Sequence, residues 1–435
     1  MRTAAAAASL FALWVALPGT GARDAAAQSA NRAVEFEDIG LTDPGAVGAR
    51  DCALRTPVLS GADVTAIAAN AAGLARLKRI HATFTTDRES GRVELTYAAT
   101  VPASDVTASR LAFAGVAVPL RVLRGSLVPA LSVYRAFSSD LDLAYQRDNA
   151  GDGRSEHFRL EQDGATYAYA LGVASDYSSV LSAGFSVFLL AGQVDTHRRY
   201  DWQPLVAAPA EQTFVLEDIT SDVSGFGARL GVQVFPHRRL RLGLAFDTPR
   251  QVNVSSASVR EETRQVDNDV GSFTRTTAEL DTRYVLPYRL AGALGVSFSS
   301  LFVTLQADYI DWALATIDGH RIYTPDIDPV LERVIGVAAG VEWTPPGTAL
   351  RVRAGFSHAP APLRYLQADR IDNDEMRRVT SHSGPTRVSA GAAALLFRRV
   401  VVEASWEHGG GSRKSDVVSD DLSETTVSLA GSFYF

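Results

Sequence analysis

The last eleven residues of the chain, Thr425 to Phe435, read TTVSLAGSFYF. In steps of two, Val427, Leu429 and Phe433 fall on one face, and small or polar residues fill most of the other. A period of two is typical of a β-strand with two different faces. A tilted strand needs about ten residues to cross the hydrocarbon core of a bilayer. The segment therefore predicts a strand that crosses a membrane.

The same pattern recurs upstream, and it keeps charged side chains on one face. In Leu350 to Ser357, LRVRAGFS, Arg351 and Arg353 alternate with apolar residues. Arg241, Glu403 and Glu407 hold equivalent positions in their own segments. An arginine facing lipid near the bilayer midplane costs roughly 2–4 kcal/mol. The charged face is therefore expected to line the lumen of a barrel.

The connections between these segments alternate between short and long. The short ones lie near 121–126, 175–179, 236–238, 297–300, 344–347 and 398–399, and the long polar ones at 87–108, 148–165, 192–225, 248–286, 312–333, 359–386 and 409–424. Short periplasmic turns and long external loops give this alternation in outer-membrane barrels. A soluble Greek-key sandwich has no reason to show it.

Counting the alternating segments gives an all-β transmembrane antiparallel barrel of about fourteen strands over residues 78–435. The strands are placed at 78–86, 109–118, 127–138, 166–174, 181–190, 227–235, 239–247, 287–297, 301–311, 334–343, 350–358, 387–397, 400–408 and 425–435. An even number leaves both ends of the barrel on the periplasmic side. Residues 92–101 also alternate and are either strand or loop.

Residues 1–27 have the character of a secretory signal peptide. Arg2 precedes an apolar run from Ala4 to Leu17, and Ala25 to Ala27 supply small residues for cleavage. The single cysteine, Cys52, leaves no internal disulfide framework. The net charge of −7 is spread along the chain, so there is no basic face for nucleic acid. We expect a bacterial outer-membrane location.

Residues 28–77 do not alternate and form a separate, partly helical segment. The Ala-rich stretch 61–77 favours a short helix with Asp63 near its start. Such a segment could hang in the periplasm or fill the lumen as a plug, or hatch. A plug is favoured by the glycines at inward positions, which leave room for it: Gly172, Gly184, Gly231, Gly243, Gly295, Gly336, Gly340, Gly355 and Gly391. Strand curvature is the other explanation for these glycines.

Several short motifs, in order, are similar to a known family. They are Ser60–Asp63 with Asn70–Ala75; Leu111–Phe113 with Val118–Leu120; Gly225–Val232 with Phe235–Pro236 and Leu240–Gly243; Asp308–Tyr309 with Trp312; and Leu350–Ser357 with Pro360. Together they resemble the outer-membrane hydrophobic-compound transporters of the FadL/TodX type over nearly the whole of residues 28–435.

The resemblance implies a fourteen-stranded barrel with an N-terminal hatch and passive uptake of long-chain fatty acids or aromatic hydrocarbons. Asn70, Ala71, Ala72 and Gly73 align with the family's hatch motif, Asn-Pro-Ala-Gly. Ala71 stands where the motif has its proline. Phe435 resembles the aromatic ending that such barrels present to the barrel assembly machinery. The expected partners are a hydrophobic small molecule and outer-membrane lipid.

A substrate with a carboxylate could pair with an inward arginine, and the candidates are Arg229, Arg241, Arg351 and Arg353. Alternatively, these arginines pair with Glu342, Glu403, Glu407 or acids of the hatch and line a polar lumen.

No catalytic or metal constellation is apparent, so we expect neither an enzyme nor a cofactor. His382–Ser383 and Ser357–His358 are neighbours in sequence, and neighbours on a strand face opposite ways. The histidines are not at metal-ligand spacing. The remaining alternatives are a general aqueous porin and a barrel that acts as a secretion or assembly partner.

Overall fold

The computed structural model describes residues 47–97, 99–100, 104–122, 125–149, 154–204, 211–266, 269–321, 331–360, 362, 365–367, 376–378, 381–397, 399–414 and 418–435. The expected signal peptide and residues 28–46 of the expected hatch lie outside these ranges.

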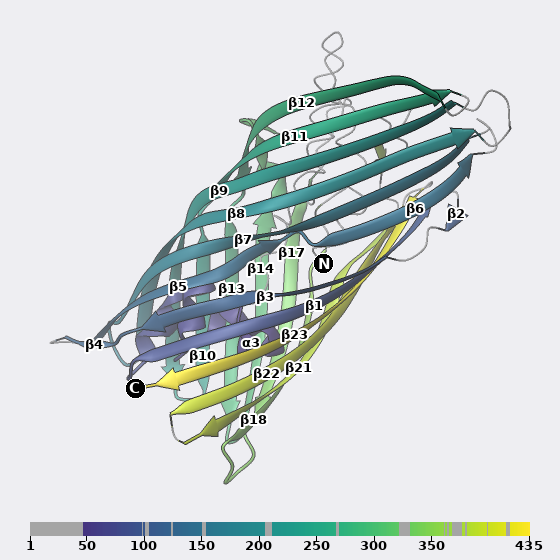
Figure 1. Ribbon diagram of the computed structural model, residues 1–435. Coiled ribbons are helices and arrows are strands. Elements are labelled where there is room, and N and C mark those ends of the chain that lie inside the picture. The colour runs from purple at the N-terminus through teal and green to yellow at the C-terminus, as the bar shows by residue number, and fades with distance from the viewer. Residues whose placement is uncertain are drawn as a thin grey trace.

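Fourteen antiparallel barrel strands form a closed ring (Figure 1). Strand β1 closes it, because β1 pairs with β3 on one side and with β23 on the other. Three barrel strands are interrupted and carry two labels each. In order they are β1 (His81–Tyr97), β3 (Ser104–Ala117), β5 (Ser126–Ser138) with β6 (Leu141–Asn149), β7 (Arg154–Asp176), β8 (Leu181–Pro204), β9 (Glu211–His237), β10 (Leu240–Asp247) with β11 (Arg250–Val266), β12 (Asp269–Leu286) with β13 (Arg289–Phe298), β14 (Leu301–Asp311), β17 (Arg333–Trp343), β18 (Leu350–His358), β21 (Ser381–Leu396), β22 (Val400–Lys414) and β23 (Val418–Tyr434).

Short additional strands lie at the ends of the ring and between barrel strands. They are β2 (Ala99–Thr100), β4 (Leu120–Arg121), β15 (Thr316–Ile317), β16 (His320–Arg321), β19 (Tyr365–Gln367) and β20 (Met376–Arg378), and a 3₁₀ turn, η5 (Trp312–Leu314), follows β14. The predicted number of barrel strands is confirmed.

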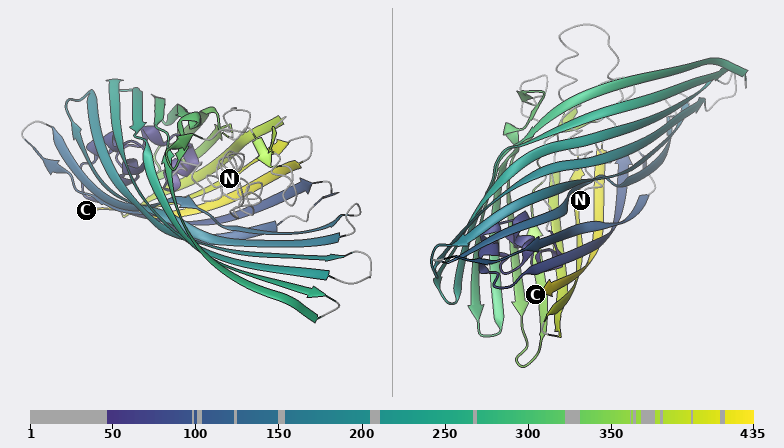
Figure 2. Two further views of the ribbon diagram at one scale, coloured as in Figure 1. Left: turned by 90° about the horizontal axis from the view of Figure 1, so that it is seen from above. Right: turned by 60° about the vertical axis from the view of Figure 1, so that its left-hand side comes forward.

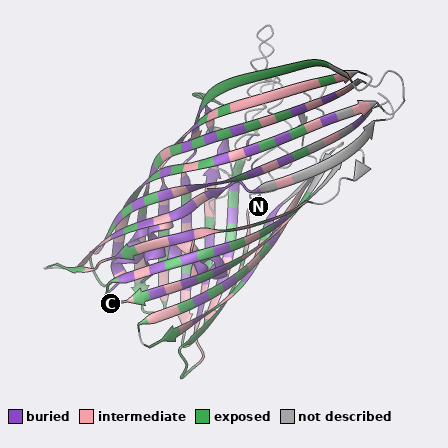
Figure 3. Ribbon diagram, in the orientation of Figure 1, coloured by how far each residue is buried: buried purple, intermediate pink, exposed green. Residues whose placement is uncertain are grey.

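The outer and inner faces of the barrel wall carry different side chains, as the alternation in the sequence predicts. Large apolar side chains point outward and are exposed, among them Phe84, Leu131, Leu171, Leu189, Phe226, Leu244, Leu305, Ile335, Leu429 and Phe433. Their in-strand neighbours point inward and are buried, as Ser428 and Ala430 are beside Leu429. Exposed and buried residues alternate along the strands (Figure 3). So many exposed apolar side chains are favourable when the outer face of the barrel lies in lipid.

Several strands are much longer than predicted. Residues 192–225 and 248–286 were expected to be loops, but β9 spans 27 residues and β11 and β12 form a long hairpin. In these extensions polar side chains are mixed with buried apolar ones such as Val223 and Val252 on the inner face, so the alternation is weaker than at the strand centres. Of the stretch 92–101, which was left open as strand or loop, residues 92–97 belong to β1 and 99–100 form β2, while 98 and 101 lie outside the described residues.

The N-terminal segment lies inside the ring, at the end where the short connections are (Figures 1 and 2). It consists of α3 (Ala49–Leu54) and three 3₁₀ turns, η2 (Pro57–Leu59), η3 (Val64–Ala68) and η4 (Ala71–Arg76). One helix over 61–77 was predicted, whereas η3 and η4 form two separate turns. Asp63 caps η3 by accepting a hydrogen bond from the Thr65 amide, and Asn70 caps η4 through the Ala72 amide. No helix of the described residues is long and apolar enough to span a membrane.

Candidate functional site

Residues 47–77, here called the plug, touch the inner wall all the way round. Helix α3 contacts β17, β18, β21, β22 and β23, whereas η2 contacts β10 and β13. The turns η3 and η4 contact β1, β3, β5, β7, β8 and β9. Thr56 and Val58 hydrogen bond to Thr304 and Gln306 on β14, at 2.8 and 3.0 Å. Every barrel strand therefore meets the plug.

Glycines on the inner wall allow this close approach. A Cβ built on Gly184 would lie 2.4 Å from the carbonyl carbon of Ala71, and one on Gly355 would lie 2.5 Å from the Ala53 oxygen. Gly172, Gly231, Gly243, Gly295, Gly340 and Gly391 also face plug atoms within 3.0 Å. Gly336 is the exception among the glycines singled out from sequence, because its Cβ would face Ala359. The backbone of the plug thus occupies the space that side chains would fill.

Asn70 is fully buried and links two segments of the plug to each other and to the wall. Its Nδ2 donates to the Val58 carbonyl at 3.0 Å and lies 3.3 Å from the Val232 carbonyl on β9. Next to it, Gly73 has no room for a side chain, because a Cβ there would lie 2.0 Å from the Ser60 carbonyl oxygen. Ala71 and Ala72 are buried against β8. Of the four hatch residues singled out from sequence, Asn70, Ala71 and Ala72 therefore lie where the plug meets the wall, and Gly73 packs against Ser60 and Ala66 within the plug.

The four predicted arginines all belong to inward-facing positions, but their surroundings differ. Arg353 is buried and forms ion pairs with Glu342 at 2.7 Å and with Glu403 at 3.0 Å. Arg229 grips Asp247 with two nitrogens and also donates to the Ala68 carbonyl of the plug. Both guanidinium groups thus pair with acids of the protein itself, which is the alternative that the sequence left open, although Nη2 of Arg353 is buried without a hydrogen-bond partner among the described residues.

The other two predicted arginines are less enclosed. The guanidinium carbon of Arg241 lies 4.8 Å from the centre of the Phe302 ring, a cation–π contact next to the plug. Arg351 is exposed, close to the turn between β17 and β18.

Above the plug, the inner wall carries a continuous apolar lining. It joins Ile67 and Leu74 of the plug to buried side chains of the wall, among them Phe113, Tyr134, Phe137, Phe188, Leu190, Val252, Val254, Leu286 and Trp312. These side chains are almost fully buried against one another, and apolar surface of this kind favours hydrophobic solutes by about 25 cal/mol per Å² that leaves water. Sequence analysis placed part of this lining in loops, because it extends beyond the predicted strands.

Among the described residues, the backbone pairing of the wall is short between β3 and the β5–β6 barrel strand. Only five register pairs join them, from Phe113–Tyr134 to Ala117–Ala130. Beyond these pairs β3 continues to Ser104 along β1, while β6 follows β7. Among the described residues, no register pair joins β3 to β6. We call this place the wall break.

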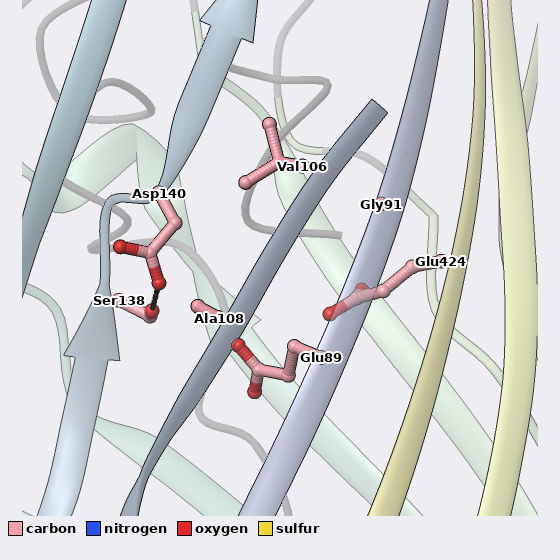
Figure 4. A pocket seen from close by; sticks show the side chains of 7 residues that line it. All are labelled: Glu89, Gly91, Val106, Ala108, Ser138, Asp140 and Glu424. Atoms are coloured by element: carbon pink, nitrogen blue, oxygen red, sulfur yellow. Dashed lines mark hydrogen bonds between the residues drawn. The ribbon is translucent and has the colours of Figure 1, made fainter. Parts of the chain in front are cut away.

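A small pocket, partly open to solvent, lies at the wall break. Figure 4 shows the side chains that line it, which are those of Glu89, Val106, Ala108, Ser138, Asp140 and Glu424, together with Gly91. Arg110 of β3 reaches across to Asp140, with Nε 3.1 Å from Oδ2. Arg135 of β5 reaches Asp87 of β1 at 3.1 Å and also binds Glu89. Side-chain ion pairs therefore bridge the gap that the backbone ladder leaves.

No family model matches the sequence, and no curated protein matches it either. Solved structures do match in fold. A Pseudomonas aeruginosa FadL homologue aligns with 89% of this chain and 98% of its own, with a TM-score of 0.63 and 13% sequence identity. The Pseudomonas putida toluene transporter TodX aligns with 90% of this chain and 98% of its own, with a TM-score of 0.59 and 12% sequence identity. The Ralstonia pickettii toluene transporter TbuX aligns with 92% of this chain and 97% of its own, with a TM-score of 0.55 and 12% sequence identity. The chain has the fold of these proteins, so the predicted fold resemblance is confirmed.

Proposed function

We propose that this protein is an outer-membrane channel for the passive uptake of hydrophobic small molecules, with long-chain fatty acids or aromatic hydrocarbons as its substrates. The structures that share its fold are described as a FadL homologue and as toluene transporters. The belt of exposed apolar side chains supports a position in a lipid bilayer. In this proposal, residues 28–77 form the hatch and residues 78–435 the barrel.

The observation that carries the proposal is the plug that meets every barrel strand beneath an apolar lining. A general aqueous porin needs an open, polar lumen, and plug backbone lies against the wall where such a lumen would be. The porin is therefore the weaker alternative. A role as a secretion or assembly partner has no feature of its own to support it.

The wall break offers a route out of the lumen that leaves the plug in place. Phe113, Tyr134 and Phe137 belong to the apolar lining and lie on the strands that border the break. A hydrophobic solute that leaves sideways passes from this lining into lipid, so it never has to enter water. We propose this lateral exit, with the Arg110–Asp140 and Arg135–Asp87 pairs at its edge.

Uptake by intact cells tests the proposed function. Cells that lack the protein are compared with the same cells carrying it, using radiolabelled p-xylene, dodecan-1-ol and dodecanoate, with a trisaccharide as the polar control. The proposal expects faster entry of at least one hydrophobic compound and unchanged entry of the sugar. Equal uptake of all three hydrophobic compounds would refute it, and faster sugar entry would favour the porin.

A further inference from the structure

Arg250 is a buried arginine of the inner wall that forms no ion pair with any acid in the described part of the chain. It begins β11, next to Pro249, and is only 8% exposed. Its Nε is buried without a hydrogen-bond partner, and no ion pair joins Arg250 to any of the residues that the structure describes. The guanidinium carbon of Arg250 lies 5.9 Å from the centre of the Phe137 ring.

The acids near Arg250 are already engaged by other groups. Asp247 is held by both ends of the Arg229 guanidinium and lies 3.7 Å from Arg289. Asp308 accepts from Arg289 and, at 2.8 Å, from Gln306. Asp247 and Asp308 are thus held by Arg229 and Arg289, and among the described residues neither acid forms an ion pair with Arg250.

The surroundings of Arg250 are otherwise apolar. Its strand neighbour Val252, its cross-strand partner Leu286 and the nearby Phe188 belong to the apolar lining. Gly227 on β9 makes room for it, since a Cβ there would lie 2.8 Å from Cγ of Arg250 and 2.6 Å from the Phe188 ring. An unpaired charge in an apolar place is costly, and buried ionisable groups of this kind usually mark functional sites.

We infer that Arg250 binds the carboxylate of an amphiphilic substrate whose hydrocarbon tail lies along the apolar lining. This inference rests on the proposed function and narrows its substrate class to hydrophobic carboxylates. A guanidinium receives a carboxylate through two parallel hydrogen bonds, which neutralises both charges away from water. Arg229 and Arg353 are less suited to this task, because the protein's own acids already occupy them.

The test compares a carboxylate with a neutral compound of the same chain length. The purified mature chain, in a non-ionic detergent, is titrated with radiolabelled dodecanoate and dodecan-1-ol. Arg250→Met removes the charge and keeps most of the apolar stem. We expect it to weaken dodecanoate binding at least about ten-fold, the loss of one charge-assisted bidentate contact, with dodecan-1-ol binding unchanged within about two-fold. Arg264→Met, at an exposed arginine of the same strand, is the matched control and should change neither.

Two further variants keep the test decisive if Arg250→Met does not fold. Arg250→Lys should retain the preference for dodecanoate over dodecan-1-ol, and Arg250→Gln should lose it. Equal binding of the two compounds by the wild-type protein, or an equal loss of both in Arg250→Met, would overturn the inference. Uptake of p-xylene by cells distinguishes failure of the Arg250 inference from failure of the proposed channel function. Normal p-xylene entry without a preference for the carboxylate rejects only the role of Arg250. Absence of uptake of every hydrophobic compound rejects the channel.

Discussion

Single residues on the inner wall determine whether the plug can dock. Gly184 meets backbone atoms of the plug, and backbone cannot move aside as a flexible side chain can. An inserted methyl group in a well-packed interior costs about 1–3 kcal/mol. The glycines were visible in the sequence, but only the structure shows that plug backbone faces them.

Gly184→Ala is therefore expected to loosen the plug without unfolding the barrel. The added methyl would lie 2.4 Å from the Ala71 carbonyl carbon and 2.5 Å from the Ala72 nitrogen, so η4 must shift. We expect frequent brief openings in planar-bilayer recordings, consistent with a loss of about 1–3 kcal/mol in docking. Gly292→Ala is the matched control, because a methyl there meets nothing within 4 Å. Identical recordings from the two variants would contradict the proposed close fit.

Asp51 gives the plug a dependence on pH. It is buried in α3 and shares a hydrogen bond with Ser60. Burial raises the pKa of its carboxyl from 3.8 to about 7, while Arg50 opposes the rise, and Asp63 and Glu403 add to it. A pKa that is higher in the docked plug than in the undocked chain means that the docked state binds the proton more tightly. Docking should therefore weaken as pH rises from about 4 to about 7 and then level off.

The measurement is hydrogen exchange of residues 49–76 at pH 5 and at pH 8, corrected for intrinsic exchange rates. We expect protection to fall by at least about ten-fold between the two values, since one pKa unit corresponds to about 1.4 kcal/mol. Asp51→Asn has no carboxyl to titrate at this position, so the fall in protection from pH 5 to pH 8 should be abolished. A wild-type plug that is equally protected at pH 5 and pH 8 would argue against this role of Asp51.

Among the structural elements, the strand centres could be predicted and the strand ends could not. In β23, apolar and small or polar side chains alternate around Leu429 because one face of the strand meets lipid and the other meets the lumen. In β12, residues 271–281 are exposed on both faces, so no alternation marks them as strand. Arg250 was missed for a different reason: the whole of 248–286 was assigned to a loop, and the pairing of Arg250 with Leu286 is visible only in the structure.

The wall break is another feature that the sequence hides, because it is an absence of pairing between β3 and β6. A bulky group placed there should obstruct the proposed lateral exit. In a Cys52→Ala background, Ala108→Cys introduces a thiol that lines the pocket at the break. Modifying it with a large maleimide should abolish most of the protein-dependent uptake of p-xylene.

The neighbouring Ser109→Cys provides the control, since Ser109 is exposed and alternation places it on the opposite face of β3. Its modified form should take up p-xylene at nearly the unmodified rate. If both labelled variants transport equally well, substrate leaves by another route, such as past the plug.

At the scale of the whole molecule, the plug and the ring depend on each other through their shape. The plug has little regular structure of its own, since α3 has six residues and the other three elements are 3₁₀ turns. Short segments of this kind are marginal in water. The ring, in contrast, is closed by backbone pairing that does not involve the plug. The ring is therefore expected to form without the plug, whereas the plug needs the ring.

Deleting residues 28–77, with the expected signal 1–27 retained, should accordingly leave a folded but open barrel. The inward glycines would line a wide aqueous lumen once the plug backbone is gone. We expect single-channel conductance in planar bilayers to rise several-fold and the trisaccharide to enter cells, because a wet, polar lumen passes small solutes. A folded deletion variant with the conductance of the full protein would mean that the plug is not what closes the lumen. An unfolded deletion variant would mean that the ring needs the plug to form.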